Sequence, residues 1–194
     1  GASLPVEQIS WADAMKFCEK LTQVEKTAGR LPTGYEYSLP TEAQWEYACR
    51  AGTTTAYSFG NNITNQQANF LTDDWAGDAP GLASISSGSA VGKTTIVGKY
   101  PPNALGFHDM HGNVWEWCRD GGEDYADGIA RDPVGPSVGS LRVYRGGSWN
   151  YYGRYMRSAN RYWYTPVNRL SNLGFRLSLQ PETAKTEGAG RAGA

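Results

Sequence analysis

Apolar residues recur at helical spacing in two segments of the first third of the chain. In the first segment Ser10 stands where a helix N-cap would, and Asp13 occupies the third helical position, which suits the free amide groups of a first turn. The apolar positions that follow lie three or four residues apart, as on the buried face of a helix. They are Ala14, Phe17, Cys18 and Leu21. The pattern predicts a helix that starts after Ser10.

The second segment carries a clearer start signal. Thr41 and Gln44 have the spacing of a capping box, in which each side chain accepts a hydrogen bond from the other residue's backbone amide. The apolar stripe that follows consists of Trp45, Ala48 and Cys49. Gly52 suits the end of this helix, because glycine adopts the left-handed conformation at little cost.

Periodicity weakens after the second predicted helix. Residues 53–103 are rich in Gly, Ser, Thr, Asn and Asp, which predicts long ordered loops with one short strand near residues 95–97. Residues 141–149 and 173–179 are expected to be strands that close one small sheet. Residues 181–194 offer nothing to bury and are expected to be a disordered tail. Loops of this length need buried anchors, which we expect to be Trp115, Trp117, Trp149 and Phe175.

Composition and charge narrow the class of protein. The chain has 194 residues, enough for one domain with its own core. Its formal net charge is −1, so no overall field attracts nucleic acid or an anionic membrane. No run of about 18 apolar residues occurs, so no transmembrane segment is expected. The three cysteines cannot all pair with one another, and Cys18 is expected to be a small buried thiol.

Residues 142–176 carry the strongest functional signal. Five of the twelve tyrosines lie between residues 151 and 164, together with Trp163 and with Asn, Ser, Arg and Thr. Rigid amphipathic rings among adaptable polar groups are typical of a protein-binding surface. The segment contains no Asp, Glu, Cys or His, so it lacks the usual nucleophiles and general bases. Two other interpretations stay open: a structural aromatic cluster, and a nucleic-acid site built on the segment's seven arginines.

Three motifs in a fixed order point to a known family. They are Leu39–Ala48 (LPTEAQWEYA), Gly112–Trp117 (GNVWEW) and Arg145–Trp149 (RGGSW). Together they resemble the formylglycine-generating enzyme, or sulfatase-modifying factor, family. The resemblance runs from about residue 5 to residue 177 and implies an α+β, C-type-lectin-like fold: two helices, small antiparallel sheets and long ordered loops. It implies one domain over residues 1–180, in which the family's opening strands are missing ahead of Pro5.

The same resemblance implies that the family's chemistry is absent. Active members bind copper through a pair of cysteines shortly after the RGGS motif. In this chain Tyr151 stands where the first cysteine would be, and no second one follows. A related branch uses three histidines to bind iron, whereas this chain has only His108 and His111, which we expect to pack or hydrogen-bond in a turn. No redox cofactor and no enzymatic activity are therefore expected.

A third branch fits the aromatic segment better. The segment resembles the variable proteins of diversity-generating retroelements, whose C-terminal lectin-fold region is rewritten at template adenines. Their fixed frame is matched by Arg145–Trp149, Arg157–Ala159, Arg161, Pro166, Arg169 and Gly174–Arg176. The ligand-binding positions implied between them are Asn150, Tyr151, Tyr152, Arg154, Tyr155, Asn160, Tyr162, Trp163, Tyr164, Thr165, Asn168, Leu170, Ser171 and Asn172. Most are residues that adenine changes in an Asn codon can produce; Trp163 needs another template codon or is fixed.

This resemblance implies a non-catalytic protein that binds an unknown ligand, most simply another protein and not nucleic acid. It also implies display on a bacterial cell surface, as a lipoprotein, or on a phage, with the anchor outside residues 1–194. The alternative is a degenerate or uncharacterised oxidoreductase of the family, or a domain partner of another protein.

A structural calcium ion is the one cofactor that the family resemblance implies. Its ligands would be the Asp109 side chain, the carbonyls of Gly112 and Val114, and the Glu116 carboxylate. All four are hard oxygen donors close together in sequence, as calcium requires. The alternative is that Glu116 bridges loops without a metal.

Overall fold

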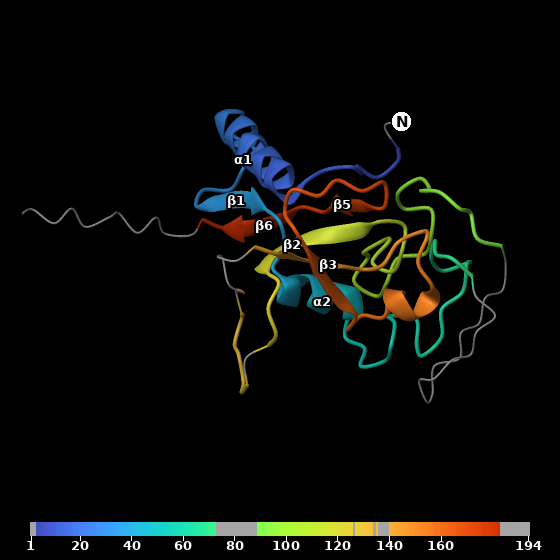
Figure 1. Cartoon of the computed structure of the whole chain (residues 1–194). Helices are drawn as coiled ribbons and strands as arrows, with labels where there is room; N and C mark the ends of the chain where they lie inside the picture. The colour runs from blue at the N-terminus through green and yellow to red at the C-terminus, as the bar shows by residue number, and fades with distance from the viewer. Residues whose placement is uncertain (1–2, 73–88, 126, 134, 136–139, 183–194) are drawn as a thin grey trace, which may run out of the picture.

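The computed structural model describes residues 3–72, 89–125, 127–133, 135 and 140–182 (Figure 1). The elements are α1 (Trp11–Thr27), β1 (Tyr35–Ser38), α2 (Glu42–Arg50), β2 (Trp115–Gly121), β3 (Arg142–Arg145), the 3-10 helix η1 (Gly153–Met156), β4 (Arg161–Tyr164), β5 (Leu173–Phe175) and β6 (Ser178–Pro181). This confirms an α+β chain with two α-helices, small sheets and long loops. No helix in the described residues is long and apolar enough to cross a bilayer.

Both predicted helices form with the predicted caps. The Ser10 side chain accepts a hydrogen bond from the Asp13 backbone amide at the start of α1. The capping box of α2 is complete, and the helix ends at Arg50, followed by Ala51 in the left-handed conformation. One position on α1 differs from the prediction. Ala14 and Cys18 are buried, but Phe17 is 48% exposed because it lies at the rim of the stripe, edge-on to Phe175.

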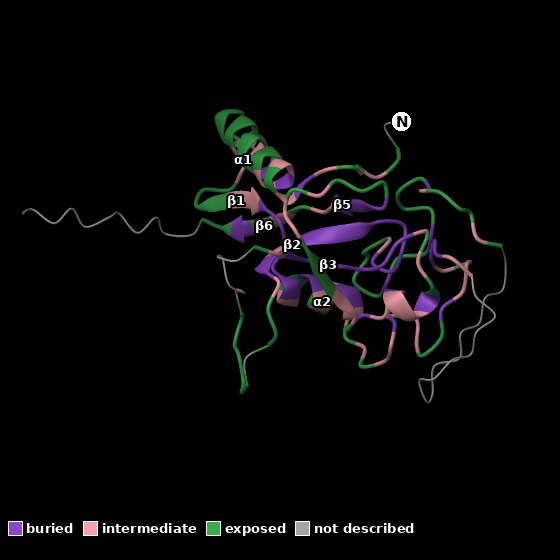
Figure 2. Cartoon of the chain, viewed as in Figure 1, coloured by how far each residue is buried: buried purple, intermediate pink, exposed green. Residues whose placement is uncertain are grey.

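The four-stranded sheet has the order β4-β3-β2-β5. β2 runs antiparallel to β3 but parallel to β5, so this sheet is mixed rather than purely antiparallel. A second, two-stranded sheet pairs β1 with β6, and Tyr35 lies opposite Pro181. Figure 2 shows β2 as buried, with α1 mostly exposed above it. The central strand of the sheet is therefore the axis around which the core is built.

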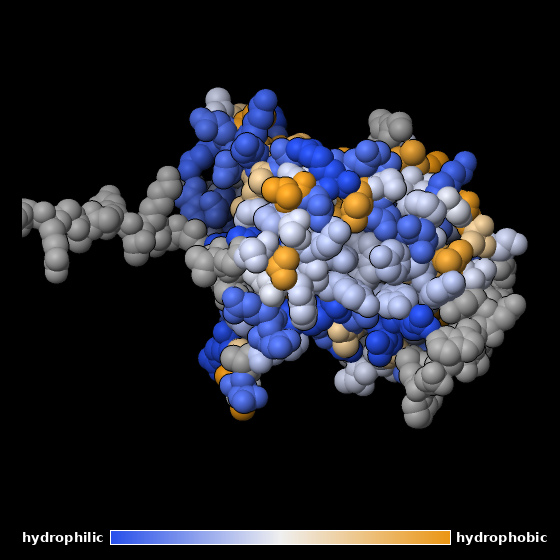
Figure 3. All heavy atoms as spheres, in the orientation of Figure 1, coloured by the Kyte–Doolittle hydropathy of each residue, from blue (hydrophilic) through white to orange (hydrophobic). Residues whose placement is uncertain are grey.

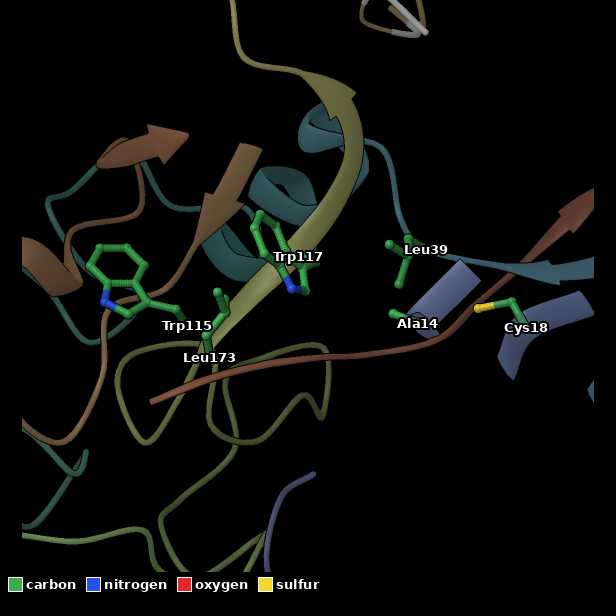
Figure 4. Close-up of a cluster of buried hydrophobic side chains, with 6 residues drawn as sticks. All are labelled: Ala14, Cys18, Leu39, Trp115, Trp117 and Leu173. Atoms are coloured by element: carbon green, nitrogen blue, oxygen red, sulfur yellow. The ribbon is translucent and has the colours of Figure 1, made fainter. Parts of the chain in front are cut away.

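Three hydrophobic clusters make up the core. The first joins α1, β2 and β5, and Figure 4 shows Trp117 near Leu39 and Ala14, with Trp115 farther along β2 beside Leu173. The second packs α2 against the sheet through Trp45, Cys49, Met110, Cys118 and Val143. The third gathers Tyr57, Ile63, Ala68, Phe70 and Met156. The third cluster explains how the loop over residues 53–72 stays ordered with almost no regular structure.

Several predictions about the loops and strands are wrong. Residues 95–97 are not a strand, because the backbone of Thr95 bonds to the side chain of Asn113 instead of to a neighbouring strand. Residues 173–179 form two strands in different sheets, not one. Pro181 pairs in β6, and the Glu182 amide donates to the Gly34 carbonyl at 2.8 Å, so the chain stays ordered beyond 181. Residues 183–194 of the predicted tail lie outside the described residues.

The predicted aromatic anchors divide into two pairs. Trp115 and Trp117 are buried as expected, at 2% and 0% exposure. Trp149 and Phe175 are only partly buried, which contradicts the prediction. Trp149 lies in a turn, where its indole Nε1 reaches the Ser171 carbonyl at 3.4 Å, and Phe175 lies on the less covered side of the edge strand β5. The paired tryptophans on the central strand are thus the deep anchors.

Candidate ligand-binding surface

Two tyrosines of residues 151–164 contact the buried Trp115: Tyr151, just ahead of η1, and Tyr162 in β4. The Trp115 ring is edge-on to Tyr151, Tyr144 and Tyr162, with centroid separations of 5.4, 4.9 and 5.7 Å. Tyr155 in turn packs edge-on against Tyr151 at 5.4 Å. Such edge-to-face contacts fix the rings relative to one another, because the positive edge of one ring meets the negative face of the next. The result is an aromatic cluster with a buried floor and an exposed rim.

Exposure separates the floor of this cluster from its rim. Tyr151 and Tyr155 are half-buried and pack against the first and third core clusters. The exposed residues are Tyr152 at 37%, Tyr162 at 40%, Trp163 at 36% and Tyr164 at 43%. In Figure 3 residues of intermediate hydropathy, drawn pale, cover much of the middle of the face in view. We refer to these four exposed residues together with Tyr151 and Tyr155 as the aromatic surface.

The fixed frame around the aromatic surface is held by a buried arginine. Arg145 is 0% exposed and forms ion pairs with Glu42 and Glu46 of α2. Its guanidinium also donates to the carbonyls of Ser158, at 2.9 Å, and Asn160, at 2.6 Å. One side chain thus ties helix α2 to the turn that leads into β4. That turn is therefore held in place by Arg145.

A second frame arginine links the aromatic surface to a residue that the sequence reasoning missed. Arg161 donates two hydrogen bonds to the Glu42 carboxylate, at 2.8 and 2.7 Å. Its guanidinium lies over the Tyr125 ring at 4.1 Å and over the Trp163 ring at 5.1 Å, within cation–π range. Tyr125 is 66% exposed and therefore extends the surface beyond residues 142–176. No pattern in the sequence marks Tyr125, because its partners are more than 30 residues away.

The remaining predicted positions differ in exposure. Asn150, Leu170 and Ser171 are exposed, whereas Arg154, Asn160, Thr165 and Asn168 are half-buried. Asn172 is a correction, because it is only 7% exposed and its amide Nδ2 donates to Asn150 Oδ1 at 2.9 Å and to Ser148 Oγ at 3.3 Å. These bonds turn the Asn172 side chain inward, where it supports the loop and cannot reach a ligand. Along β4 the side chains alternate, so Tyr162 lies with Trp115 and Tyr144 on one face of the sheet, whereas Trp163 lies with Arg161 on the other.

Two phenols beside Trp115, those of Tyr144 and Tyr162, have raised pKa values. Burial raises the pKa of Tyr144 well above its usual range, and the neighbouring Tyr151, Tyr162 and Tyr164 add to that effect. Burial also raises the pKa of Tyr162, with Tyr155 and Tyr151 contributing in the same direction. A neutral phenol both donates and accepts hydrogen bonds. The surface therefore offers apolar ring faces together with two-way hydrogen-bonding groups.

The three cysteines are all buried and lie in the packed core. Burial raises the pKa of Cys18 to about 11 and that of Cys49 to about 12, and raises the pKa of Cys118 well above the usual thiol value. Thiols of this kind are not the nucleophilic or metal-binding thiolates found at reactive sites. The buried thiol expected for Cys18 is confirmed.

The two histidines have structural partners. His111 is 3% exposed, and its Nδ1 lies 2.7 Å from the Met156 carbonyl, so Nδ1 carries the proton. Its Nε2 accepts a hydrogen bond from the Ser58 amide at 3.1 Å. Burial lowers the pKa of His111 to about 4, so the ring is neutral at physiological pH. His108 Nδ1 lies 2.8 Å from the Tyr100 carbonyl, and so both rings pack and hydrogen-bond as expected.

The four predicted calcium ligands lie together along one groove of about 610 Å³. Asp109, Gly112, Val114 and Glu116 all line this groove. Burial raises the pKa of Asp109, and the nearby Glu116 carboxylate contributes in the same direction. In this groove Asp109 Oδ2 accepts a hydrogen bond from the Gly98 amide at 2.7 Å.

The Glu116 carboxylate already has strong partners. Arg176 donates to Oε2 from Nε at 2.5 Å and to Oε1 from its second nitrogen at 2.7 Å. Oε2 also accepts from the indole of Trp45 at 2.7 Å. The two-point contact with Arg176 is the geometry that makes such pairs strong. A cation in the groove would therefore share Glu116 with Arg176.

Comparison with known sequences places the chain among proteins of one domain type. Residues 1–180 match the sulfatase-modifying factor enzyme 1-like domain. The chain is 37% identical over 181 residues to a formylglycine-generating enzyme of Streptomyces coelicolor, covering 90% of this chain and 52% of that protein. It is 34% identical over 182 residues to serine/threonine-protein kinase pkn1 of Chlamydia pneumoniae, covering 91% of this chain and 24% of that protein. The chain thus spans about half, or less, of the length of these relatives.

Solved structures support the same grouping. Treponema denticola variable protein 1 superposes with a TM-score of 0.70 at 26% identity, covering 92% of this chain and 72% of that one. PvdO from Pseudomonas aeruginosa superposes with a TM-score of 0.66 at 28% identity, covering 93% of this chain and 63% of that one. The fold is the C-type-lectin-like fold of formylglycine-generating-enzyme-like proteins. The chain belongs to the sulfatase-modifying factor enzyme 1-like domain family.

Proposed function

We propose that this chain is a non-catalytic ligand-binding protein whose aromatic surface is diversified by a retroelement through adenine mutagenesis. The observation that carries the proposal is that residues 142–176 contain two kinds of side chain, some that hold the fold together and some that are exposed. The frame residues Arg145, Arg161 and Arg176 make ion pairs with glutamates outside that segment. Side chains such as Tyr152 and Tyr164 instead lie exposed on the surface. Exposed positions can change identity at low cost in stability, because surface substitutions usually shift it by less than about 0.5 kcal/mol.

The likeness to Treponema denticola variable protein 1 supports this function for the chain as a whole. The loss of the cysteine pair supports it as well, because Tyr151 stands at the position of the first cysteine. The most suitable ligand is a protein, since exposed Tyr, Trp and Arg are the usual hot-spot residues of protein interfaces. Display on a bacterial cell surface or on a phage, through an anchor outside residues 1–194, is part of the proposal.

The test of diversification is a DNA comparison. A second, non-coding copy of the DNA for residues 142–176 should lie near the gene, next to a reverse transcriptase gene, and should differ from it mainly at adenines. The differences should fall at codons such as those for Tyr152 and Tyr164 and should spare those for Arg145 and Arg161. Differences spread evenly over frame and surface codons would refute the proposal.

We also propose that a calcium ion binds in the groove, and this can be tested. The donors along the groove are oxygens, and Glu116 Oε1 accepts one hydrogen bond from Arg176, which leaves it a second lone pair. Asp109, Glu116 and the carbonyls of Gly112 and Val114 would hold the ion, which would supply local order and no chemistry. Calcium should then raise the melting temperature with the logarithm of its concentration, and magnesium should not. The Asp109→Asn variant should lose most of that rise.

A role as one domain of a longer protein is the second candidate. The match to serine/threonine-protein kinase pkn1 covers 24% of that protein, so a domain of this type occurs there beside other sequence. In that case the aromatic surface would contact a neighbouring domain and would not be diversified. The DNA comparison above separates the two candidates, because a domain interface predicts no second copy.

A further inference from the structure

Three polar side chains join the two ends of the tyrosine-rich segment, residues 150–172. Ser148 Oγ and Asn172 Nδ2 each donate to Asn150 Oδ1 at 2.9 Å, and Asn172 Nδ2 also donates to Ser148 Oγ at 3.3 Å. Ser148 and Asn172 are buried, so water cannot readily replace their hydrogen bonds. The bonds connect the turn where the segment starts to the residue just before β5. We refer to these three side chains as the asparagine clasp.

The backbone beside the clasp is bonded to the start of the central strand β2. The Trp149 amide donates to the Asn113 carbonyl at 3.0 Å, and the Trp115 amide donates to the Asn172 carbonyl at 2.8 Å. Tyr151, the residue that follows the first asparagine of the clasp, packs edge-on against Trp115 at 5.4 Å. The clasp therefore holds both ends of the segment beside the tryptophan that lies under the aromatic surface.

The clasp requires an acceptor at one asparagine and a donor at the other. The Asn150 oxygen accepts from two partners, and the Asn172 NH2 group donates to two. Asn150→Asp keeps the acceptor, whereas Asn172→Asp removes the donor, which the Asn150 NH2 group can replace if that amide turns over. With both changes two carboxylates face each other, and within the clasp only the Ser148 hydroxyl is left to donate. The clasp then cannot form, because like charges repel and the acceptors lack donors.

Mutation at adenines would produce these changes together. Asparagine codons begin with adenine, and exchange of that adenine for guanine gives an aspartate codon. Other adenine changes in the same codons give serine or tyrosine, whose side chains lack the amide group that the clasp uses. A rewritten stretch that contained both asparagines would therefore often release the ends of the segment that displays the aromatic surface.

We propose that the asparagine clasp marks the limits of the rewritten stretch, which lies between Asn150 and Asn172 and includes neither. Both asparagines then act as positioning residues: they hold the ends of the segment and leave ligand contact to the residues between them. Asn150 belongs to the frame although the residue is exposed, because its side-chain oxygen is turned toward the clasp. The inference rests on the proposed function and narrows the set of ligand-contacting positions.

A double-mutant cycle, measured by urea denaturation, tests whether the two asparagines act together. Asn150→Asp and Asn172→Asp should each have a small effect, whereas the double variant should lower the ratio of folded to unfolded protein at least about fivefold more than the two single losses combined. The matched control pairs Asn150→Asp with Asn168→Asp, because Asn168 lies in the same segment but takes no part in the clasp. The control pair should be additive. Additivity in the clasp pair as well would overturn the inference.

Hydrogen exchange followed by NMR shows where the effect falls. The amides of Tyr151 and Leu173, which donate to the Ser148 and Leu170 carbonyls, flank the clasp. In the double variant these amides should exchange faster than the loss of global stability accounts for, while the amides of β6 should follow global stability alone. If the double variant does not fold, Asn172→Ala is measured in its place. Equal acceleration in β6 and beside the clasp would overturn the inference, because the asparagines would then support the fold in general.

The DNA comparison tests the limits of the rewritten stretch. In the second copy, the codons for Asn150 and Asn172 should match those of the gene, and adenine differences should fall only between them. Adenine differences at either codon would overturn the inference and leave diversification in place. Absence of a second copy would overturn the proposed function together with these limits, so the two failures are distinguishable.

Discussion

Acid should destabilise this protein through His111. The buried ring is neutral, with Nδ1 donating to Met156 and Nε2 accepting from Ser58. Protonation would place a charge in the core. It would also make Nε2 a donor that faces the Ser58 amide, which is a donor too, so that hydrogen bond would be lost. Its folded pKa is about 4, whereas an unfolded histidine titrates near 6.5. Between these values the unfolded state binds the extra proton, so stability is complete above about pH 7 and falls as the pH drops toward 4.

The magnitude follows from the difference between the two pKa values. About 2.5 pH units at about 1.4 kcal/mol per unit give a loss of about 3.5 kcal/mol once both states are protonated. Between pH 7.5 and pH 4.5 the expected loss from this one group is about 2.5 kcal/mol. This is a large fraction of the 5–15 kcal/mol, very roughly, that holds a domain folded.

The assay is urea denaturation followed by tryptophan fluorescence at pH 7.5, 5.5 and 4.5. The chain has two histidines, so His108→Gln is a matched control that keeps the steep loss, while His111→Gln should flatten it. Comparing variants at each pH cancels the contributions of other groups, such as Asp109 and Asp120, whose pKa values burial raises. If His111→Gln folds too weakly for this comparison, the His111 resonances of the unmodified protein should titrate near pH 4 by NMR. Titration near 6.5 would show that the reasoning is wrong.

The remaining predictions concern stability at fixed pH and are measured by chemical denaturation. Trp117→Ala should cost about 3–5 kcal/mol, whereas Tyr152→Ser should cost less than about 1 kcal/mol; equal costs would contradict the separation of anchor from surface. Arg145→Met should cost about 3–5 kcal/mol, because it removes two buried ion pairs and leaves the Ser158 and Asn160 carbonyls without their donor, and a neutral result would show that the frame does not depend on this arginine. Gly112→Ala should fail to fold or lose several kcal/mol, since its φ of +87° disfavours other residues and the added Cβ would lie 2.3 Å from the Asn69 carbonyl oxygen; wild-type stability would contradict that.

The sequence predicted the local elements best. The caps at Ser10 and Thr41 are local signals, and both helices form where the caps place them. The strands were harder, because β2 pairs with β3 and β5 through partners that lie far along the chain. Residues 173–179 alternate apolar and other residues without a break, as one strand would, yet Phe175 ends one strand and Ser178 starts another in a different sheet. A period of two residues indicates a strand, but it does not say which distant strand will pair with it.

The aromatic surface was predictable in composition but not in detail. The density of tyrosine marked residues 151–164, and four of the six aromatic positions expected there are exposed. Asn172 was wrongly assigned to the binding surface, because the sequence does not show whether an asparagine side chain faces solvent or bonds within a loop. Tyr125 was missed because it reaches the surface only through Arg161. For both Asn172 and Tyr125, exposure on the surface depends on long-range packing and not on the residue type.

The order of the strands makes folding depend on complete, in-frame translation of residues 150–172. β5 and β6 follow residues 150–172, and they complete the edges of the two sheets: β5 beside β2, and β6 beside β1. A polypeptide that stops or shifts frame within the tyrosine-rich stretch would lack both strands and leave Trp115, Trp117 and Leu39 uncovered. Exposed core of this kind is what chaperones and proteases recognise. If the stretch between residues 150 and 172 is diversified as proposed, products that lose the reading frame there would lack these strands and would be degraded.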